Sequence, residues 1–137
     1  MSVIKDLVTR TQNMIAFYGA ISSDTTTTGA IIDTKDMVSL YFDMSAADWT
    51  DGTYTMKIEE GDAANLSDAA VISTDKLIYG TLPAISAATA EGATLVREGV
   101  HSTKRYVRAS IVSTLTTDGA TVQMNAVAEM EQQPTGQ

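Results

Sequence analysis

Apolar and polar residues alternate along much of the chain, which is the pattern of a β-strand with one buried and one solvated face. The clearest case is MVSLYFDM at 37–44, where every second residue from Val38 to Met44 is apolar. TYTMKIEE at 53–60 follows the same rule with its tyrosine, methionine and isoleucine. We expect both segments to be strands whose apolar faces line a core.

Shorter segments elsewhere show the same alternation. Runs of turn-forming residues separate them, such as SSDTTTTG at 22–29, which we expect to be a loop. About eight strands at this spacing, without long helical periodicity, predict an all-β fold, either an antiparallel β-sandwich or a jelly-roll-like barrel. The further strands are predicted at 14–21, 30–33, 69–72, 76–79, 94–100, 104–114 and 121–130.

These segments predict a single domain at 14–130, preceded by an N-terminal segment at 1–13 and followed by a polar C-terminal tail at 131–137. Four apolar residues of the N-terminal segment lie at near-helical spacing, so the segment is either a short helix or an extended arm. Because the strand faces already provide a core, we expect these residues to contact a neighbouring molecule. They are Val3, Ile4, Leu7 and Val8.

Composition narrows the classes of function. The chain has 137 residues, a formal net charge of −8 and no cysteine. An acidic chain without a long basic run does not favour binding to nucleic acid or to an anionic membrane, because both require clustered positive charge. The lack of cysteine excludes disulfides and thiolate chemistry. The apolar run at 14–21 is too short to span a bilayer and lacks the order of a signal peptide, so we expect a soluble protein made in the cytoplasm.

Candidate catalytic and metal-binding residues are few. His101 stands alone in a predicted turn, without the acid and nucleophile that a histidine base requires. The acidic corner EEGDAANLSD lacks the spacing of a calcium loop, and its adjacent Glu59 and Glu60 point to opposite faces of a strand. We interpret it as a strand end and a solvated loop in which Asp62 or Ser67 caps a short turn. The sequence therefore favours a protein that is not an enzyme and has no metal or cofactor site.

Positive charge is concentrated at one place in this acidic chain. Lys104, Arg105 and Arg108 lie close together on the predicted strand 104–114. One interpretation is cross-strand pairing with Glu or Asp of a neighbouring strand. The other is a docking patch for an acidic partner surface or for a second copy of the chain.

Three stretches resemble a known family. They are GAISSDTTTTGAIIDTKDMVSLYFDM at 19–44, DGTYTMKIEEGDAANLSDAAVI at 51–72 and STKRYVRASIV at 102–112. Together they are similar to small head proteins of tailed bacteriophages, described as capsid decoration, cement or head-stabilisation proteins. The resemblance spans roughly 14–130.

The resemblance implies a mostly β protein without enzymatic activity or cofactor. Its partner would be the major capsid protein, and it would be made in the host cytoplasm and bind the outer capsid surface of the virion. There it would stabilise the capsid lattice against the pressure of packaged DNA. Because icosahedral shells have threefold and quasi-threefold positions, we expect a homo-oligomer, preferably a trimer, with a monomer or dimer as the alternative.

Two other functions remain open. The chain could be a head–tail connector or a tail component of the virion. A different class is a carbohydrate-binding β-sandwich module, in which Trp49, Tyr41 and Tyr54 would form a stacking surface.

Overall fold

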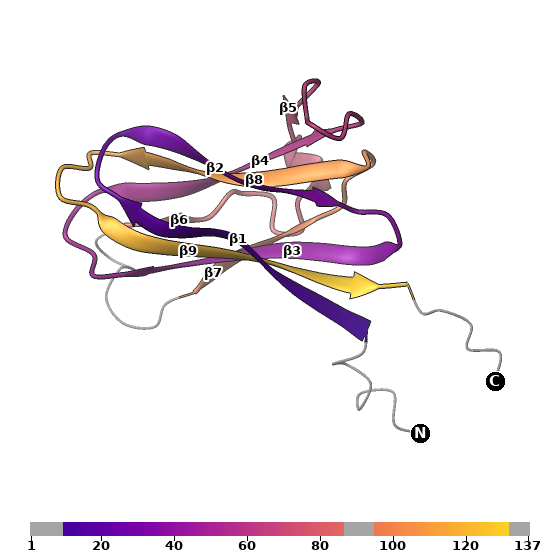
Figure 1. Ribbon diagram of the computed structural model, residues 1–137, viewed down its shortest axis with the longest axis horizontal. Coiled ribbons are helices and arrows are strands. Elements are labelled where there is room, and N and C mark those ends of the chain that lie inside the picture. The colour runs from indigo at the N-terminus through magenta and orange to yellow at the C-terminus, as the bar shows by residue number, and fades with distance from the viewer. Residues whose placement is uncertain (1–9, 87–94, 132–137) are drawn as a thin grey trace.

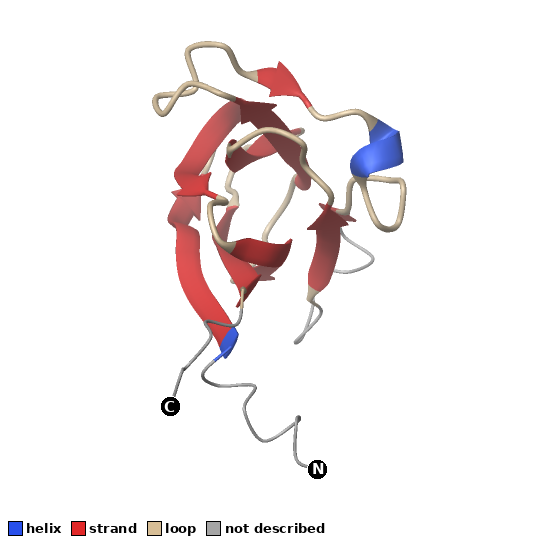
Figure 2. Cartoon of the chain, turned by 90° about the vertical axis from the view of Figure 1, so that its right-hand side faces the viewer, coloured by secondary structure: helices blue, strands red, loops and turns tan. Residues whose placement is uncertain are grey.

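Two antiparallel sheets packed against each other form the fold, as Figure 1 shows. The computed structural model describes residues 10–86 and 95–131. The predicted all-β sandwich is confirmed. A short 3₁₀ helix, η2 (Thr74–Lys76), lies at the periphery of the two layers (Figure 2). The strands are β1 (Thr11–Ile21), β2 (Thr25–Asp33), β3 (Met37–Ala47), β4 (Thr53–Gly61), β5 (Ala70–Val71), β6 (Ala84–Ile85), β7 (Val96–Val100), β8 (Tyr106–Thr114) and β9 (Ala120–Met130).

The strand order brings together segments that are distant in sequence. Sheet A has the order β1-β9-β3-β7, and sheet B has the order β2-β8-β4-β5. Strand β6 also pairs with β4, along the edge that β5 occupies further on. The first and last strands are neighbours, with Thr11 opposite Glu129, so β1 begins where β9 ends.

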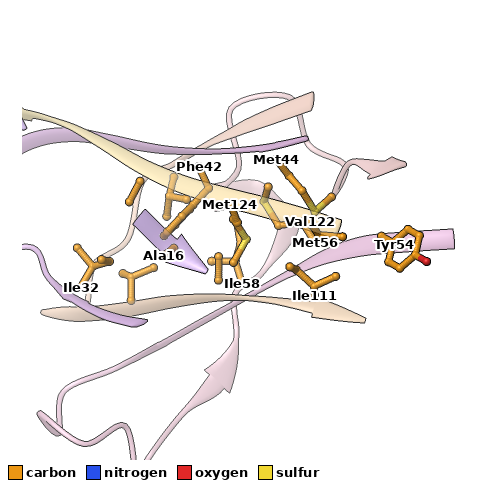
Figure 3. Packing of buried hydrophobic residues seen from close by; sticks show 14 of the residues in the cluster. Ala16, Ile32, Phe42, Met44, Tyr54, Met56, Ile58, Ile111, Val122 and Met124 are labelled. Atoms are coloured by element: carbon orange, nitrogen blue, oxygen red, sulfur yellow. The ribbon is translucent and has the colours of Figure 1, made fainter. Parts of the chain in front are cut away.

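The core lies between the sheets and consists of the predicted apolar strand faces (Figure 3). Burial of such side chains is the main favourable contribution to folding. The following residues of β3, β4, β8 and β9 are fully buried: Phe42, Met44, Tyr54, Met56, Ile58, Val107, Ala109, Ile111, Val122, Met124, Ala126 and Ala128.

One residue of the predicted apolar faces lies outside the core. Val38 is 63% exposed, although the alternation placed it with Leu40 and Phe42. The pairing of β3 with β9 is irregular between Met37 and Ser39. An irregularity of this kind shifts the alternation by one residue and moves a side chain to the other face.

The predicted loop at 22–29 is wrong for its second half. The threonines from Thr25 to Thr28 form the start of β2 and pair with β8. Threonine is β-branched and suits an extended backbone, and this preference outweighs its frequency in turns. Gly29 follows inside the strand, where any side chain would overlap the carbonyl oxygen of Ala109.

The segment 76–79 is a second correction. It was expected to be a strand, but its first residue ends η2 and Leu77 forms only an isolated bridge to Val100. The turn formers just before it, Ser73 to Asp75, favour the tight 3₁₀ turn. Strand β6 was not predicted, because two residues are too few to show a period.

The first strand was predicted to begin at residue 14 and begins three residues earlier. Strand β1 begins at Thr11, and just before it Arg10 forms an ion pair of 2.7 Å with Glu129. The predicted partner-binding residues Val3, Ile4, Leu7 and Val8 lie outside the described residues, as does 132–137 of the predicted tail.

Candidate binding surface on sheet A

The predicted basic cluster lies on and beside β8 of sheet B, and its members form ion pairs within the chain. Arg108 Nη2 is 2.8 Å from Glu59 Oε1, and the two residues are opposite each other on β8 and β4. Arg105 donates two hydrogen bonds of 2.9 Å to the Asp33 carboxylate. These bonds lower the pKa of Asp33 to about 2. This geometry agrees with the cross-strand interpretation of the cluster.

The acidic corner after β4 is also occupied by internal contacts. Lys104 Nζ is 3.0 Å from Asp62 Oδ2. The Asp68 carboxylate accepts hydrogen bonds from the backbone N–H groups of Asp62 (2.8 Å) and Ala63 (3.1 Å), which lower its pKa. Asp68 therefore caps this turn, in place of the predicted Asp62 or Ser67. In the described part of the chain, no group of three His, Cys, Asp or Glu residues could hold a metal ion.

The outer face of sheet A has a different character, because its charged residues, Asp43, Arg97 and Glu129, are spread over three strands and polar or apolar side chains lie between them. A hydrogen-bonded chain of polar side chains crosses its centre. Asn125 Nδ2 donates to Asp43 Oδ1 at 2.8 Å, and Gln123 Nε2 donates to Asn125 Oδ1 at 3.1 Å. The pairing register places one row of side chains across all four strands, namely Ile15, Asn125, Asp43 and Arg97.

Two large apolar side chains of β1 lie on this outer face. Ile15 is 65% exposed and Tyr18 is 66% exposed. They are opposite Asn125 and Gln123, whereas Phe17 is opposite the buried Met124. The register shifts between Ile15 and Phe17, so one extra residue is inserted there. This bulge places Tyr18 on the same side as Ile15, which strict alternation would prevent. We call the outward side chains of sheet A the sheet A face.

A groove lies at the β7 edge of sheet A. Its first part is a hollow of about 220 Å³, and a second hollow of about 290 Å³ shares four residues with it. The shared residues are Ser39, Leu40, Val100 and His101. The first part is also lined by Tyr41, Ile78, Tyr79, Arg97 and Gly99, and the second by Thr34, Met37, Val38, Ser102 and Thr103. We call the two hollows together the edge groove.

The segment after η2 forms one wall of the edge groove. The Ile78 N–H donates to the Gly99 carbonyl at 2.9 Å, and the His101 N–H donates to the Lys76 carbonyl at 2.7 Å. A side chain at position 99 would overlap Cγ1 of Ile78. Glycine at this position therefore lets Ile78 lie directly against β7.

Two buried carboxylates hold this wall in place. Glu98 is fully buried, and its Oε1 accepts hydrogen bonds from the N–H groups of Tyr79 (2.8 Å) and Gly99 (2.9 Å). Its Oε2 has no hydrogen-bond partner among the described residues.

Glu60 is the second of these carboxylates. It accepts hydrogen bonds from Lys76 Nζ and Ser102 Oγ, both at 2.6 Å, and so joins the end of η2 and the segment after β7 to β4. Breaking a buried contact of this kind leaves an uncompensated polar group, so the wall is firmly positioned.

Arg97 at the groove differs from most basic residues of the chain. Within residues 10–86 and 95–131, only Arg97 and Lys35 lack an ion pair with a carboxylate. Arg97 was not predicted as a site residue, because it stands alone in LVREGV, outside the cluster of basic residues at 104–108. No local signal distinguishes a free arginine from a paired one.

The aromatic trio considered for carbohydrate stacking does not come together. Tyr54 is fully buried, and its hydroxyl donates to the Asp51 carbonyl at 2.7 Å. The Trp49 indole N–H donates to the Gly52 carbonyl at 3.0 Å, and its ring packs against the core. Of the three residues, only Tyr41 belongs to the sheet A face. The predicted stacking surface is therefore wrong.

Comparison with known proteins adds no assignment. No protein-family model matches the chain, and no curated protein is similar to it in sequence. Among the described residues, no helix is long and apolar enough to cross a membrane. The geometry of the sheet A face and the motifs of the sequence therefore carry the functional argument.

Proposed function

We propose that the protein is a capsid decoration, or cement, protein. It binds the outer surface of a phage head and stabilises the lattice of the major capsid protein against the pressure of packaged DNA. The family resemblance of 19–44, 51–72 and 102–112 supports the phage head as its location. The contrast between the two outer faces supports a binding role for sheet A.

The composition of the sheet A face suits a protein interface. Interface centres are enriched in tyrosine and depleted of charge. The sheet A face exposes Ile15 and Tyr18, and its central polar side chains bond to one another. The charges of sheet B neutralise each other in pairs such as Arg108–Glu59. In the proposed complex, sheet A faces the capsid and sheet B faces solvent.

The proposal includes the assembled state. The chain is made in the host cytoplasm, where its net charge of −8 favours solubility. It then occupies many equivalent sites on the shell. A trimer matches the threefold and quasi-threefold positions of such a shell, because a symmetric oligomer makes the same contact with each surrounding subunit.

Co-sedimentation with undecorated capsids of the parent phage tests the proposal. The unmodified chain should sediment with the capsids at a fixed ratio to the major capsid protein. Tyr18→Ser should weaken binding by about thirtyfold or more, as expected for a tyrosine at the centre of an interface. Val71→Ser is the matched control, because Val71 is an exposed apolar residue on β5 of sheet B.

Cryo-electron microscopy of the virion gives the independent result. Density for the chain on the outer shell, with sheet A towards the capsid, is expected. Density only at the portal vertex would replace the proposal with a connector role. If the shell carries no density for the chain, or if Val71→Ser weakens binding as much as Tyr18→Ser, the proposal fails.

A further inference from the structure

We infer that the edge groove binds a peptide segment in which a large apolar side chain is adjacent to an acidic one. The inference rests on the proposed function only for the source of the segment, which would be a capsid subunit. The chemistry of the segment follows from the groove itself.

The size of the first hollow suits a single side chain better than a small-molecule ligand. Pockets for small molecules usually measure about 300–1,000 Å³. The first hollow, at about 220 Å³, is smaller and has room for one large apolar side chain. Its wall residues Tyr41, Ile78 and Tyr79 offer apolar contact. Such an anchor in a well-formed pocket is the usual centre of a protein interface.

The charge of the groove selects an acidic neighbour for that side chain. The chain has 17 acidic residues and a net charge of −8, so an acidic segment is repelled from most of its surface. None of the residues that line the edge groove is acidic, and Arg97 is the one lining residue with a full charge. Arg97 is an exposed residue, and its guanidinium has no ion pair with a carboxylate among the described residues. An arginine in this state can bind a carboxylate through two parallel hydrogen bonds.

The shape of the groove selects an extended segment. The second hollow continues from His101 towards Val38 and Thr103, so the bound chain can extend beyond the anchor. Glu98 and Glu60 fix the wall by the hydrogen bonds described above. The groove therefore needs little rearrangement to bind, which lowers the entropic cost of association.

A titration of the ¹⁵N-labelled protein, followed by NMR, tests the inference with three capped tetrapeptides. They have the sequences Gly-Phe-Asp-Gly, Gly-Phe-Asn-Gly and Gly-Ala-Asp-Gly, acetylated and amidated. The first should shift the amide signals of Tyr79, Gly99 and His101, with a dissociation constant on the order of 1 mM. The asparagine peptide should bind about three to five times more weakly, because it lacks the charge. The alanine peptide should not saturate the groove.

Variants identify the responsible groups. Arg97→Gln should remove the preference for aspartate over asparagine, while Lys35→Gln, which changes the other unpaired cation, should preserve it. Gly99→Ala should displace Ile78 and abolish binding of all three peptides, and its NMR spectrum shows whether the fold is kept. If Gly99→Ala does not fold, Tyr79→Ser provides the same test, with binding of the phenylalanine peptides lost.

The inference is overturned if the phenylalanine peptides leave the groove signals unchanged, or if the unmodified protein binds the asparagine and aspartate peptides equally well. Capsid co-sedimentation distinguishes a failure of the groove inference from a failure of the proposed function. Capsid binding without peptide binding refutes the groove inference alone. Peptide binding without capsid binding supports the groove inference and refutes the proposed function.

Discussion

Replacing Tyr54 by phenylalanine removes one hydroxyl group from the interior of the sandwich and keeps the ring. The ring is fully buried on β4, and the hydroxyl donates a hydrogen bond of 2.7 Å to the Asp51 carbonyl. The variant loses this bond and the hydrogen bond of the hydroxyl with the Thr116 side chain, so the expected loss of unfolding free energy is about 1 kcal/mol. For 137 residues this corresponds to a fall of about 3–4 °C in the thermal midpoint.

Urea denaturation provides the measurement, followed by tryptophan fluorescence and by circular dichroism. Trp49 is the only tryptophan, and its indole N–H bonds to Gly52 close to Tyr54, so fluorescence reports on this corner of the fold. Tyr18→Phe is the matched control, because it removes a hydroxyl from an exposed ring and should change stability by less than about 0.5 kcal/mol. If Tyr54→Phe is as neutral as this control, the assignment of the β4 faces is refuted.

Three further predictions concern other parts of the fold. Because hydrogen bonds from Arg105 lower the pKa of Asp33 from 3.8 to about 2, this pair should stabilise the fold above about pH 4 and lose its effect as the pH falls towards 2. Acid unfolding of Asp33→Asn should lack that contribution. Gly29→Ala should destabilise the protein by about 1–3 kcal/mol in urea denaturation, because its Cβ would overlap the Ala109 carbonyl; no loss would mean that β2 can move away. Glu98→Ala should speed amide hydrogen exchange at Tyr79 and Gly99 and leave the exchange in β8 and β9 unchanged, whereas equal protection in both proteins would contradict the role of Glu98 in holding the wall.

The strand faces could be predicted because their pattern is local. Alternation in 53–60 places Tyr54, Met56 and Ile58 on one side, and the structure buries all three. Val38 was misplaced because a bulge depends on the partner strand, which a single segment does not reveal. The strand character of Thr25–Thr28 was missed for a related reason, since pairing with β8 outweighs the turn preference of the segment.

The candidate site was harder to predict, because it depends on contacts between distant segments. Arg105 is 72 residues from Asp33, so the sequence showed a basic cluster without showing that it was neutralised. The edge groove forms where β3, β7 and the segment after η2 come together. Nothing in the sequence around Gly99 indicates that the Ile78 side chain packs against it. Cross-strand ion pairing was foreseen as one interpretation of the cluster, but its particular partners were not.

The position of β9 between β1 and β3 has a consequence for synthesis. Sheet B can pair completely once β8 has left the ribosome, whereas β1 and β3 have no common neighbour until β9 follows. Strand β1 contains no charged residue, so before that moment it presents an unprotected edge that invites aggregation. A chain ending before Ala120 should therefore sediment as aggregates, and a stable monomer of that length would contradict this order of events. Since β9 also carries Gln123 and Asn125, the sheet A face forms only after β9 has been synthesised, and a chain that stops before β9 lacks the proposed binding surface.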